Sequence, residues 1–227
     1  MVRSDIRTGL LGFLFSLATC LAAHAIEPDP IIPPAANEVV TRVVILGDSI
    51  AAGYGLDTSE AFPAYLQKLA NIAGIKVTIV NAGLSGETTS GGARRINWIL
   101  NQPVDILVIE LGGNDALRGL DLNQTEANLR SIIVSARAKF STIRIILAGM
   151  LAPPNLGQEF TERFRSIYPR IAAQESVKLI PFILDGVGGV RELNQPDGIH
   201  PTAEGHERIA SIVWPYLKAE ILAHQRK

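Results

Sequence analysis

The sequence predicts an α/β fold: a doubly wound parallel sheet of five strands between helices, in three layers (α/β/α). Two observations support it. From residue 39 onward, short runs of β-branched residues alternate with longer amphipathic stretches, which is the pattern of repeated βαβ units. Polar and glycine-rich segments follow several of these runs, where the crevice of such a sheet opens.

The expected strands are five short apolar runs bounded by polar or glycine-containing turns. They cover residues 43–46, 77–81, 106–110, 144–148 and 178–180, the last with a possible extension to residue 183. Amphipathic periodicity predicts helices between and after them. These cover residues 61–73, 93–100, 125–140, 160–175 and 202–223.

Length and composition are those of one globular domain, which we assign to residues 39–227. The chain has 227 residues, of which 47% are hydrophobic and 19% are charged, enough for a sizeable core. Its formal net charge of -1 provides no electrostatic footprint for nucleic acid. We therefore expect no nucleic-acid partner. A small-molecule substrate and a monomeric state are separate expectations.

The first 25 residues have the three parts of a secretory signal peptide. Arg3 and Arg7 precede an apolar stretch at residues 10–23, and small residues end at Ala25, after which we expect cleavage. The protein would then be exported, periplasmic or secreted, with no membrane span. Residues 26–38 are proline-rich and are predicted to form an extended linker.

Two alternatives to a cleaved signal remain open. An uncleaved anchor is disfavoured because the apolar stretch is shorter than the roughly 20 residues that span a bilayer. Residues 17–20 resemble a bacterial lipoprotein box with Cys20 as the lipid-bearing residue, although Thr19 fits poorly. Cleavage after Ala25 would remove Cys20, the only cysteine, so the exported protein would have no disulfide.

Two short motifs about 150 residues apart supply the residue types of nucleophilic catalysis. Gly47-Asp48-Ser49 follows the first strand, and Asp197-Gly198-Ile199-His200 precedes the last helix. A serine hydroxyl needs an imidazole to take its proton and a carboxylate to orient that imidazole. Two further polar segments, residues 81–86 and 112–115, follow the second and third strands.

These four segments, in this order, resemble the four blocks of the SGNH hydrolase superfamily, also called the GDSL esterases and lipases. Within it, residues 108–119 resemble the bacterial periplasmic thioesterase, lysophospholipase and arylesterase group, and Ile167-Tyr168-Pro169 also fits that group. The resemblance extends from about Val43 to Leu217. It implies a flavodoxin-like sheet and the hydrolysis of esters or thioesters through an acyl-enzyme.

The resemblance also implies a role for each matching residue. Ser49 would be the nucleophile, His200 the general base, and Asp197 the residue that orients the imidazole. The oxyanion donors would be the N–H groups of Ser49 and Gly83 and the side chain of Asn114. The competing structural interpretation is an ordinary turn at residues 114–115, a glycine cap at Gly83 and a backbone-bonded His200. Asp48 is expected to hold its loop by backbone hydrogen bonds.

The sequence says less about the substrate than about the type of reaction. Apolar residues in three loops are expected to line the pocket: Leu84, Leu117, Leu151 and Pro153. They favour an acyl chain or an aromatic ester, with a carbohydrate acetylesterase or a non-catalytic envelope protein as alternatives. No nucleotide-binding or metal-binding motif is present, so we expect neither cofactor nor metal.

Overall fold

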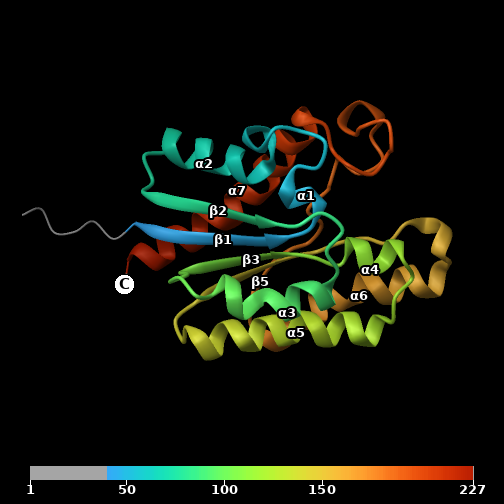
Figure 1. Ribbon diagram of the computed structural model, residues 1–227, viewed down its shortest axis with the longest axis horizontal. Helices are drawn as coiled ribbons and strands as arrows, with labels where there is room; N and C mark the ends of the chain where they lie inside the picture. The colour runs from blue at the N-terminus through green and yellow to red at the C-terminus, as the bar shows by residue number, and fades with distance from the viewer. Residues whose placement is uncertain (1–39, 227) are drawn as a thin grey trace, which may run out of the picture. The chain divides into compact units, whose positions relative to one another are not determined.

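The computed structural model describes residues 40–226, so the predicted signal peptide (1–25), Cys20 and the linker (26–38) lie outside the described residues. Five parallel strands form one sheet in the order β2-β1-β3-β4-β5 (Figure 1). Their bounds are β1 Thr41–Gly47, β2 Val77–Gly83, β3 Ile106–Glu110, β4 Arg144–Ala148 and β5 Lys178–Ile180.

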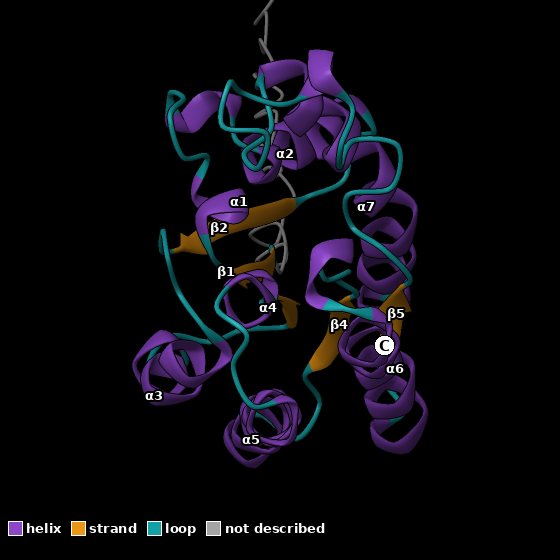
Figure 2. Ribbon diagram, turned by 90° about the vertical axis from the view of Figure 1, so that its right-hand side faces the viewer, coloured by secondary structure: helices purple, strands orange, loops and turns teal. Residues whose placement is uncertain are grey.

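Helices cover both faces of this sheet, which gives the three layers that the sequence predicts. α2 and α7 pack together on one face, and α3, α5 and α6 lie on the other (Figures 1 and 2). The helices are α1 Ser49–Ala52, α2 Phe62–Ile72, α3 Thr89–Ile99, α4 Gly113–Leu117, α5 Leu122–Lys139, α6 Gln158–Glu175 and α7 Ala203–Gln225. Short 3-10 turns occupy Thr58–Glu60, Pro154–Leu156 and Arg191–Leu193.

The direction in which successive strands are added to the sheet reverses between β1 and β3, although all strands remain parallel. The chain first moves from β1 to β2 at one edge, then returns past β1 to β3 and continues to β5. In such sheets the loops after the two strands at the reversal diverge and leave a crevice at their carboxyl ends. The loops of interest are therefore those that follow β1, β2 and β3.

The structure confirms the five predicted strands and corrects several boundaries. The proposed extension to residue 183 is wrong: β5 ends at Ile180, and Pro181, which follows, has no N–H to continue the ladder. α3 begins at Thr89, four residues before the predicted start, because the Thr88 hydroxyl accepts the N–H of Gly91 and caps the helix. α1 and α4 were not predicted, since each is only about one turn long.

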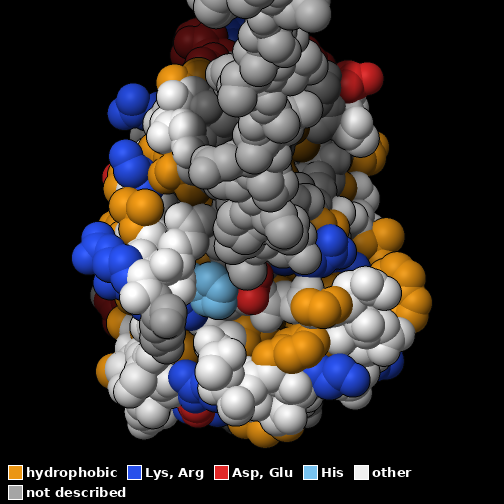
Figure 3. All heavy atoms as spheres, turned by 90° about the vertical axis from the view of Figure 1, so that its left-hand side faces the viewer, with side chains coloured by type: hydrophobic (Ala, Val, Ile, Leu, Met, Phe, Trp, Pro, Cys, Tyr) orange, Lys and Arg blue, Asp and Glu red, His pale blue; other side chains and the backbone are white. Residues whose placement is uncertain are grey.

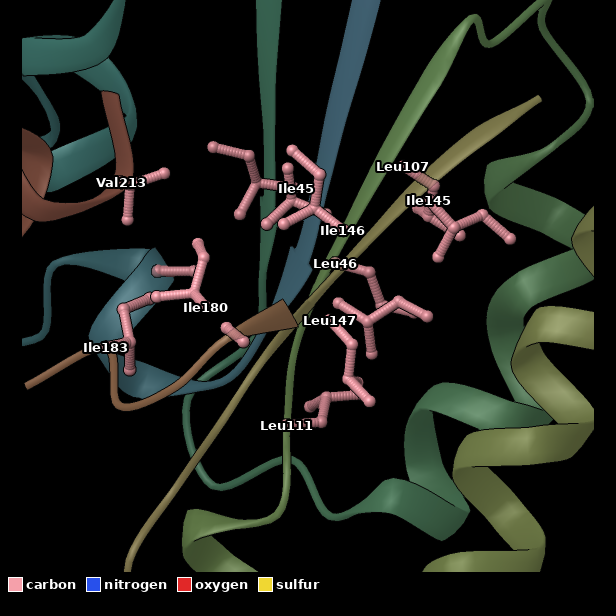
Figure 4. Close-up of a cluster of buried hydrophobic side chains, with 14 of the residues drawn as sticks. Ile45, Leu46, Leu107, Leu111, Ile145, Ile146, Leu147, Ile180, Ile183 and Val213 are labelled. Carbon is pink, nitrogen blue, oxygen red and sulfur yellow. The ribbon is translucent and has the colours of Figure 1, made fainter. Parts of the chain in front are cut away.

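The core lies on both faces of the central strands. Neighbouring residues of one strand point to opposite faces, so Ile45 and Leu46 of β1 each serve a different layer, and both are fully buried (Figure 4). Ile146, Ile180 and Val213 lie on the α7 side with Ile45. Residues 43–46 of β1 and 106–109 of β3 are all apolar, because the middle of a parallel strand between two helical layers meets no solvent.

The end of the sheet where the strands begin lies opposite the crevice. On the part of this face that the described residues form, Lys and Arg side chains are spread around the rim (Figure 3). They do not gather into one basic patch there, which agrees with the near-neutral net charge.

No helix between residues 40 and 226 is both long and apolar enough to cross a membrane.

His206 is a buried imidazole between α7 and α2. Its Nδ1 accepts the Phe62 N–H at 3.2 Å, and its ring stacks on the Phe62 ring. Burial lowers the pKa of His206 to about 4, from the usual 6.5. The unfolded chain therefore takes up this proton at a higher pH than the folded protein does, so the stability that His206 contributes is complete above pH 6.5 and is lost as the pH falls towards 4.

We expect acid to destabilise the wild type more than a His206→Gln variant, in which the amide oxygen replaces Nδ1 as acceptor. The difference in free energy of unfolding between the two proteins should change by about 3 kcal/mol from about pH 7 to about pH 4. Urea unfolding at several pH values measures it, and all other titrating groups are common to both proteins. An equal acid loss in both would contradict the assignment.

Candidate active site

Ser49 stands at the carboxyl end of β1, on the first residue of α1. Asp48 caps this helix, because its Oδ1 accepts the Ile50 N–H at 2.9 Å, as the sequence predicts for a loop-holding aspartate. The Ser49 N–H has no acceptor among the described residues. Ser49 is 8% exposed, so little of the residue meets solvent.

His200 and Asp197 come from the loop before α7 and meet Ser49 across the crevice. His200 Nε2 lies 3.0 Å from Ser49 Oγ, and His200 Nδ1 lies 2.6 Å from Asp197 Oδ2. The Gln195 N–H donates to the His200 carbonyl at 2.7 Å, which closes the base of this loop. Three residues that the sequence places in two distant motifs thus form one chain of hydrogen bonds.

The carboxylate of Asp197 determines the tautomer of His200. Hydrogen bonds from the His200 side chain, and then from the N–H groups of His200 and Ile199, lower the pKa of Asp197 to about 2. Asp197 is therefore ionised at neutral pH and can only accept, so Nδ1 of the neutral imidazole must carry the proton. Nε2 is then an unprotonated acceptor that faces the Ser49 hydroxyl.

Asn114 lies in α4, after the carboxyl end of β3. Its Nδ2 donates to Asp48 Oδ2 at 3.1 Å, which leaves the second N–H of the amide for another acceptor. Tyr168 supports the turn before α4, since its hydroxyl donates to the Leu111 carbonyl at 2.9 Å. Gly112 has φ +117°, and a Cβ there would lie 2.1 Å from the Tyr168 hydroxyl, so this turn requires glycine.

Asp48 connects the nucleophile turn to Asn114 from a buried position. Burial raises the pKa of Asp48 to about 6, against the opposing effect of its hydrogen bonds from Ile50 and Asn114. Its carboxylate is thus ionised above about pH 6 and then accepts both hydrogen bonds.

Among residues 40–226, no group of three or more His, Cys, Asp or Glu side chains is arranged to hold a metal ion.

The geometry corrects the prediction that Gly83 is an oxyanion donor. Its N–H already donates to Asn81 Oδ1 at 2.9 Å. A Cβ at Gly83 would lie 2.3 Å from the Ala52 nitrogen, so the missing side chain serves close packing between β2 and α1.

Gly86, three residues later in the same loop, has the free N–H that Gly83 lacks. No acceptor for this N–H exists in the part of the chain that the structure describes. Arg118 Nη2 donates to the Gly86 carbonyl at 3.0 Å and lies 3.5 Å from Asn114 Oδ1, so it connects this loop to α4. The sequence does show a second glycine in residues 81–86, but the local pattern does not tell which of Gly83 and Gly86 has a free N–H.

The residues predicted to line the pocket lie on three loops at the carboxyl edge of the sheet. Leu84 follows β2, Leu117 ends α4, and Leu151 follows β4; they are 54%, 47% and 44% exposed. Pro153 is half-buried near Leu151. Sequence reasoning missed Tyr54, whose ring centroid lies 4.5 Å from that of His200.

Known proteins and a protein-family model are similar to this chain over most of its length. The model of the GDSL-like Lipase/Acylhydrolase family matches residues 45–208. "Esterase TesA" of Pseudomonas aeruginosa is 44% identical over 177 residues, which cover 78% of this chain and 87% of that protein. "Thioesterase 1/protease 1/lysophospholipase L1" of Escherichia coli K12 is 39% identical over 170 residues, or 74% and 79% of the two chains. A crystal structure of TesA superposes with a TM-score of 0.76 at 42% identity, covering 79% of this chain and 99% of that one.

Proposed function

Because this chain belongs to the GDSL-like lipase/acylhydrolase family, we propose that it is an exported serine esterase that hydrolyses carboxylic esters and thioesters. The observation that carries the proposal is the continuous hydrogen-bonded chain from Ser49 Oγ through His200 to Asp197. It lies at the reversal point of the sheet, where this class of fold binds its ligands.

The first half of the proposed reaction forms an acyl-enzyme. Ser49 Oγ attacks the carbonyl carbon while His200 Nε2 takes the hydroxyl proton, and the carbonyl π electrons move to oxygen. The tetrahedral intermediate then collapses, and His200 gives the proton to the departing alcohol or thiol. Asp197 remains ionised and stabilises the imidazolium that forms between these steps.

In the second half, water takes the place of the departed alcohol or thiol. His200 Nε2 accepts a proton from the water, whose oxygen attacks the acyl carbon of the ester on Ser49. Collapse of this second intermediate releases the carboxylic acid and returns the proton to Ser49 Oγ. Each half uses one proton shuttle and consumes no cofactor.

The negative charge on the carbonyl oxygen needs donors that are already aimed at it. We propose the N–H of Ser49, the N–H of Gly86 and the free N–H of the Asn114 amide, with Gly86 in place of Gly83. All three lack another acceptor among the described residues, whereas the Gly83 N–H is engaged. Arg118 would hold the Gly86 loop at the right distance from α4.

Replacement of Asn114 by alanine should lower kcat by about 10²–10³, the usual effect of losing one oxyanion donor. KM should change little, because the oxygen carries its full charge only in the transition state. Steady-state kinetics with a p-nitrophenyl ester measures both constants. A Gln124→Ala variant on the neighbouring α5 is a matched amide control, and an equal loss there would remove Asn114 from the site.

The substrates we propose are esters and thioesters of apolar acyl groups, including lysophospholipids and aryl esters. The exposed leucines on three loops support this, and so do the names of the relatives, which include esterase, thioesterase and lysophospholipase. We also propose that the signal peptide is cleaved after Ala25 and that the enzyme is a monomer. Carbohydrate acetylesterase activity is the alternative.

A matched substrate panel tests the proposal. It contains p-nitrophenyl esters from acetyl to palmitoyl, a long-chain acyl thioester, a lysophospholipid and an acetylated sugar, each with residues 26–227. We expect hydrolysis of the acyl esters and thioester and little of the sugar. Preference for the sugar would support the acetylesterase, and no turnover on any substrate would favour a non-catalytic binding protein.

A further inference from the structure

Glu110 is a fully buried carboxyl group that the proposed reaction does not use. It is the last residue of β3, is 0% exposed, and stands opposite Gly47 in the register with β1. A carboxyl group in such a position costs free energy unless its environment compensates for the lost water.

Among the described residues, the Glu110 side chain makes two hydrogen bonds, and both go to the turn that carries the nucleophile. Its Oε2 accepts the N–H of Asp48 and the N–H of Ala51, each at 3.2 Å. These two N–H groups lie immediately before and two residues after Ser49. One carboxyl oxygen thus holds the backbone on both sides of the nucleophile.

Glu110 Oε2 can approach the turn because residue 47 is a glycine. A Cβ at Gly47 would lie 2.3 Å from Glu110 Oε2, so any other residue at this position would displace the carboxyl group. Gly47 has ordinary backbone angles, since it is absent from the residues with positive φ. The glycine at position 47 is therefore explained by the approach of Glu110 and of Ala51, and not by a strained turn.

The other oxygen of the carboxyl group is buried without a partner. Glu110 Oε1 has no hydrogen bond in the described residues. Burial, and then the nearby charge of Asp48, raise the pKa of Glu110 well above its usual range, which favours the neutral form. In that form Oε2, which accepts two N–H groups, is the carbonyl oxygen, and Oε1 carries the proton.

We propose that Glu110 is a positioning residue for the nucleophile: its Oε2 anchors the Asp48 and Ala51 N–H groups and so aims the Ser49 hydroxyl and N–H at the substrate carbonyl. The inference rests on the proposed function of Ser49. Glu110 touches neither substrate nor reacting atoms, and acts only through the backbone of the turn. A displacement of about 1 Å in such a site costs on the order of 10²-fold in rate.

Two variants of similar size distinguish the effect of the hydrogen-bond acceptor at position 110 from the effect of the space that the side chain fills. Glu110→Gln keeps a carbonyl oxygen for the two N–H groups, whereas Glu110→Met fills the same space without an acceptor. We expect the Gln variant to retain kcat within about 3-fold and the Met variant to lose about 10²-fold, with KM nearly unchanged in both. Val108→Ala, on the same face of β3 and equally buried, is the control for lost packing and should retain kcat.

Equal kcat in the Gln and Met variants, whether retained or lost, would overturn the proposal. Amide hydrogen exchange gives a second measurement if the Met variant does not fold: the Asp48 and Ala51 amides should be protected in the wild type and the Gln variant, and rapid exchange in the wild type would also overturn it. Failure of the proposed function is distinguishable, because the wild type would then neither hydrolyse esters nor react with a fluorophosphonate at Ser49.

Discussion

Replacing Ser49 by alanine is expected to abolish ester hydrolysis, with kcat lowered by at least about 10⁴-fold. The reason is that the acyl group has no oxygen to which it can be transferred, and His200 Nε2 is left facing a methyl group. Binding need not suffer, because the apolar loop residues and the remaining oxyanion donors are unchanged. Burst kinetics with a p-nitrophenyl ester should show no acyl-enzyme phase in the variant.

The fold of the Ser49→Ala variant should remain intact. The Ser49 hydroxyl makes one side-chain hydrogen bond, to His200, and a typical hydrogen bond contributes about 0.5–1.5 kcal/mol. Thermal unfolding should therefore shift by only a few degrees. Ser211 is an exposed serine on α7 whose hydroxyl donates to the Glu207 carbonyl, so Ser211→Ala is the matched control and should keep full activity. Substantial hydrolysis by Ser49→Ala would refute the nucleophile assignment.

The second large effect is expected at His200. Its replacement by alanine should lower kcat by about 10⁴-fold or more, because Ser49 then lacks a base and the leaving group lacks an acid. His206→Gln supplies a matched control, since His206 is a buried histidine that faces Phe62 and not Ser49. The His206 variant should keep its activity at neutral pH. A similar loss in both variants would mean that His200 acts through folding alone.

The same assignment predicts a dependence on pH. When His200 is protonated, Nε2 carries a proton and can no longer accept one from Ser49, so kcat/KM should fall in acid solution. Asp48, whose pKa is about 6, also loses its charge on acidification, whereas Asp197, with its pKa near 2, stays ionised. A flat profile would contradict the role of His200 as base.

Much of the fold could be predicted because local pattern determines local structure. β1 to β5 appear at the predicted runs, since apolar runs between glycine and polar turns have few alternatives to buried strands. α1 and α4 escaped prediction because helices of four and five residues show no amphipathic period. The start of α3 depended on a cap at Thr88, which propensity within the helix does not reveal.

The chemistry of the site was also accessible from residue types. Ser49, Asp197 and His200 could be selected because few side chains serve as nucleophile, base and orienting acid, and the parallel sheet brings the ends of its strands together. The structure places them within hydrogen-bonding distance of one another. Their roles remain predictions for the variants above.

By itself the sequence thus predicted the fold class, the order of the strands and longer helices, and the three residues of the hydrogen-bonded chain. Only the tertiary structure showed that the Gly83 N–H is engaged by the Asn81 side chain, whereas the Gly86 N–H has no acceptor among the described residues, which is the basis for proposing Gly86 as the donor. It alone showed that Glu110, from another strand, holds the nucleophile turn. Periodicity reports which face a residue occupies, whereas hydrogen-bond partners across the sheet are a property of the packed molecule.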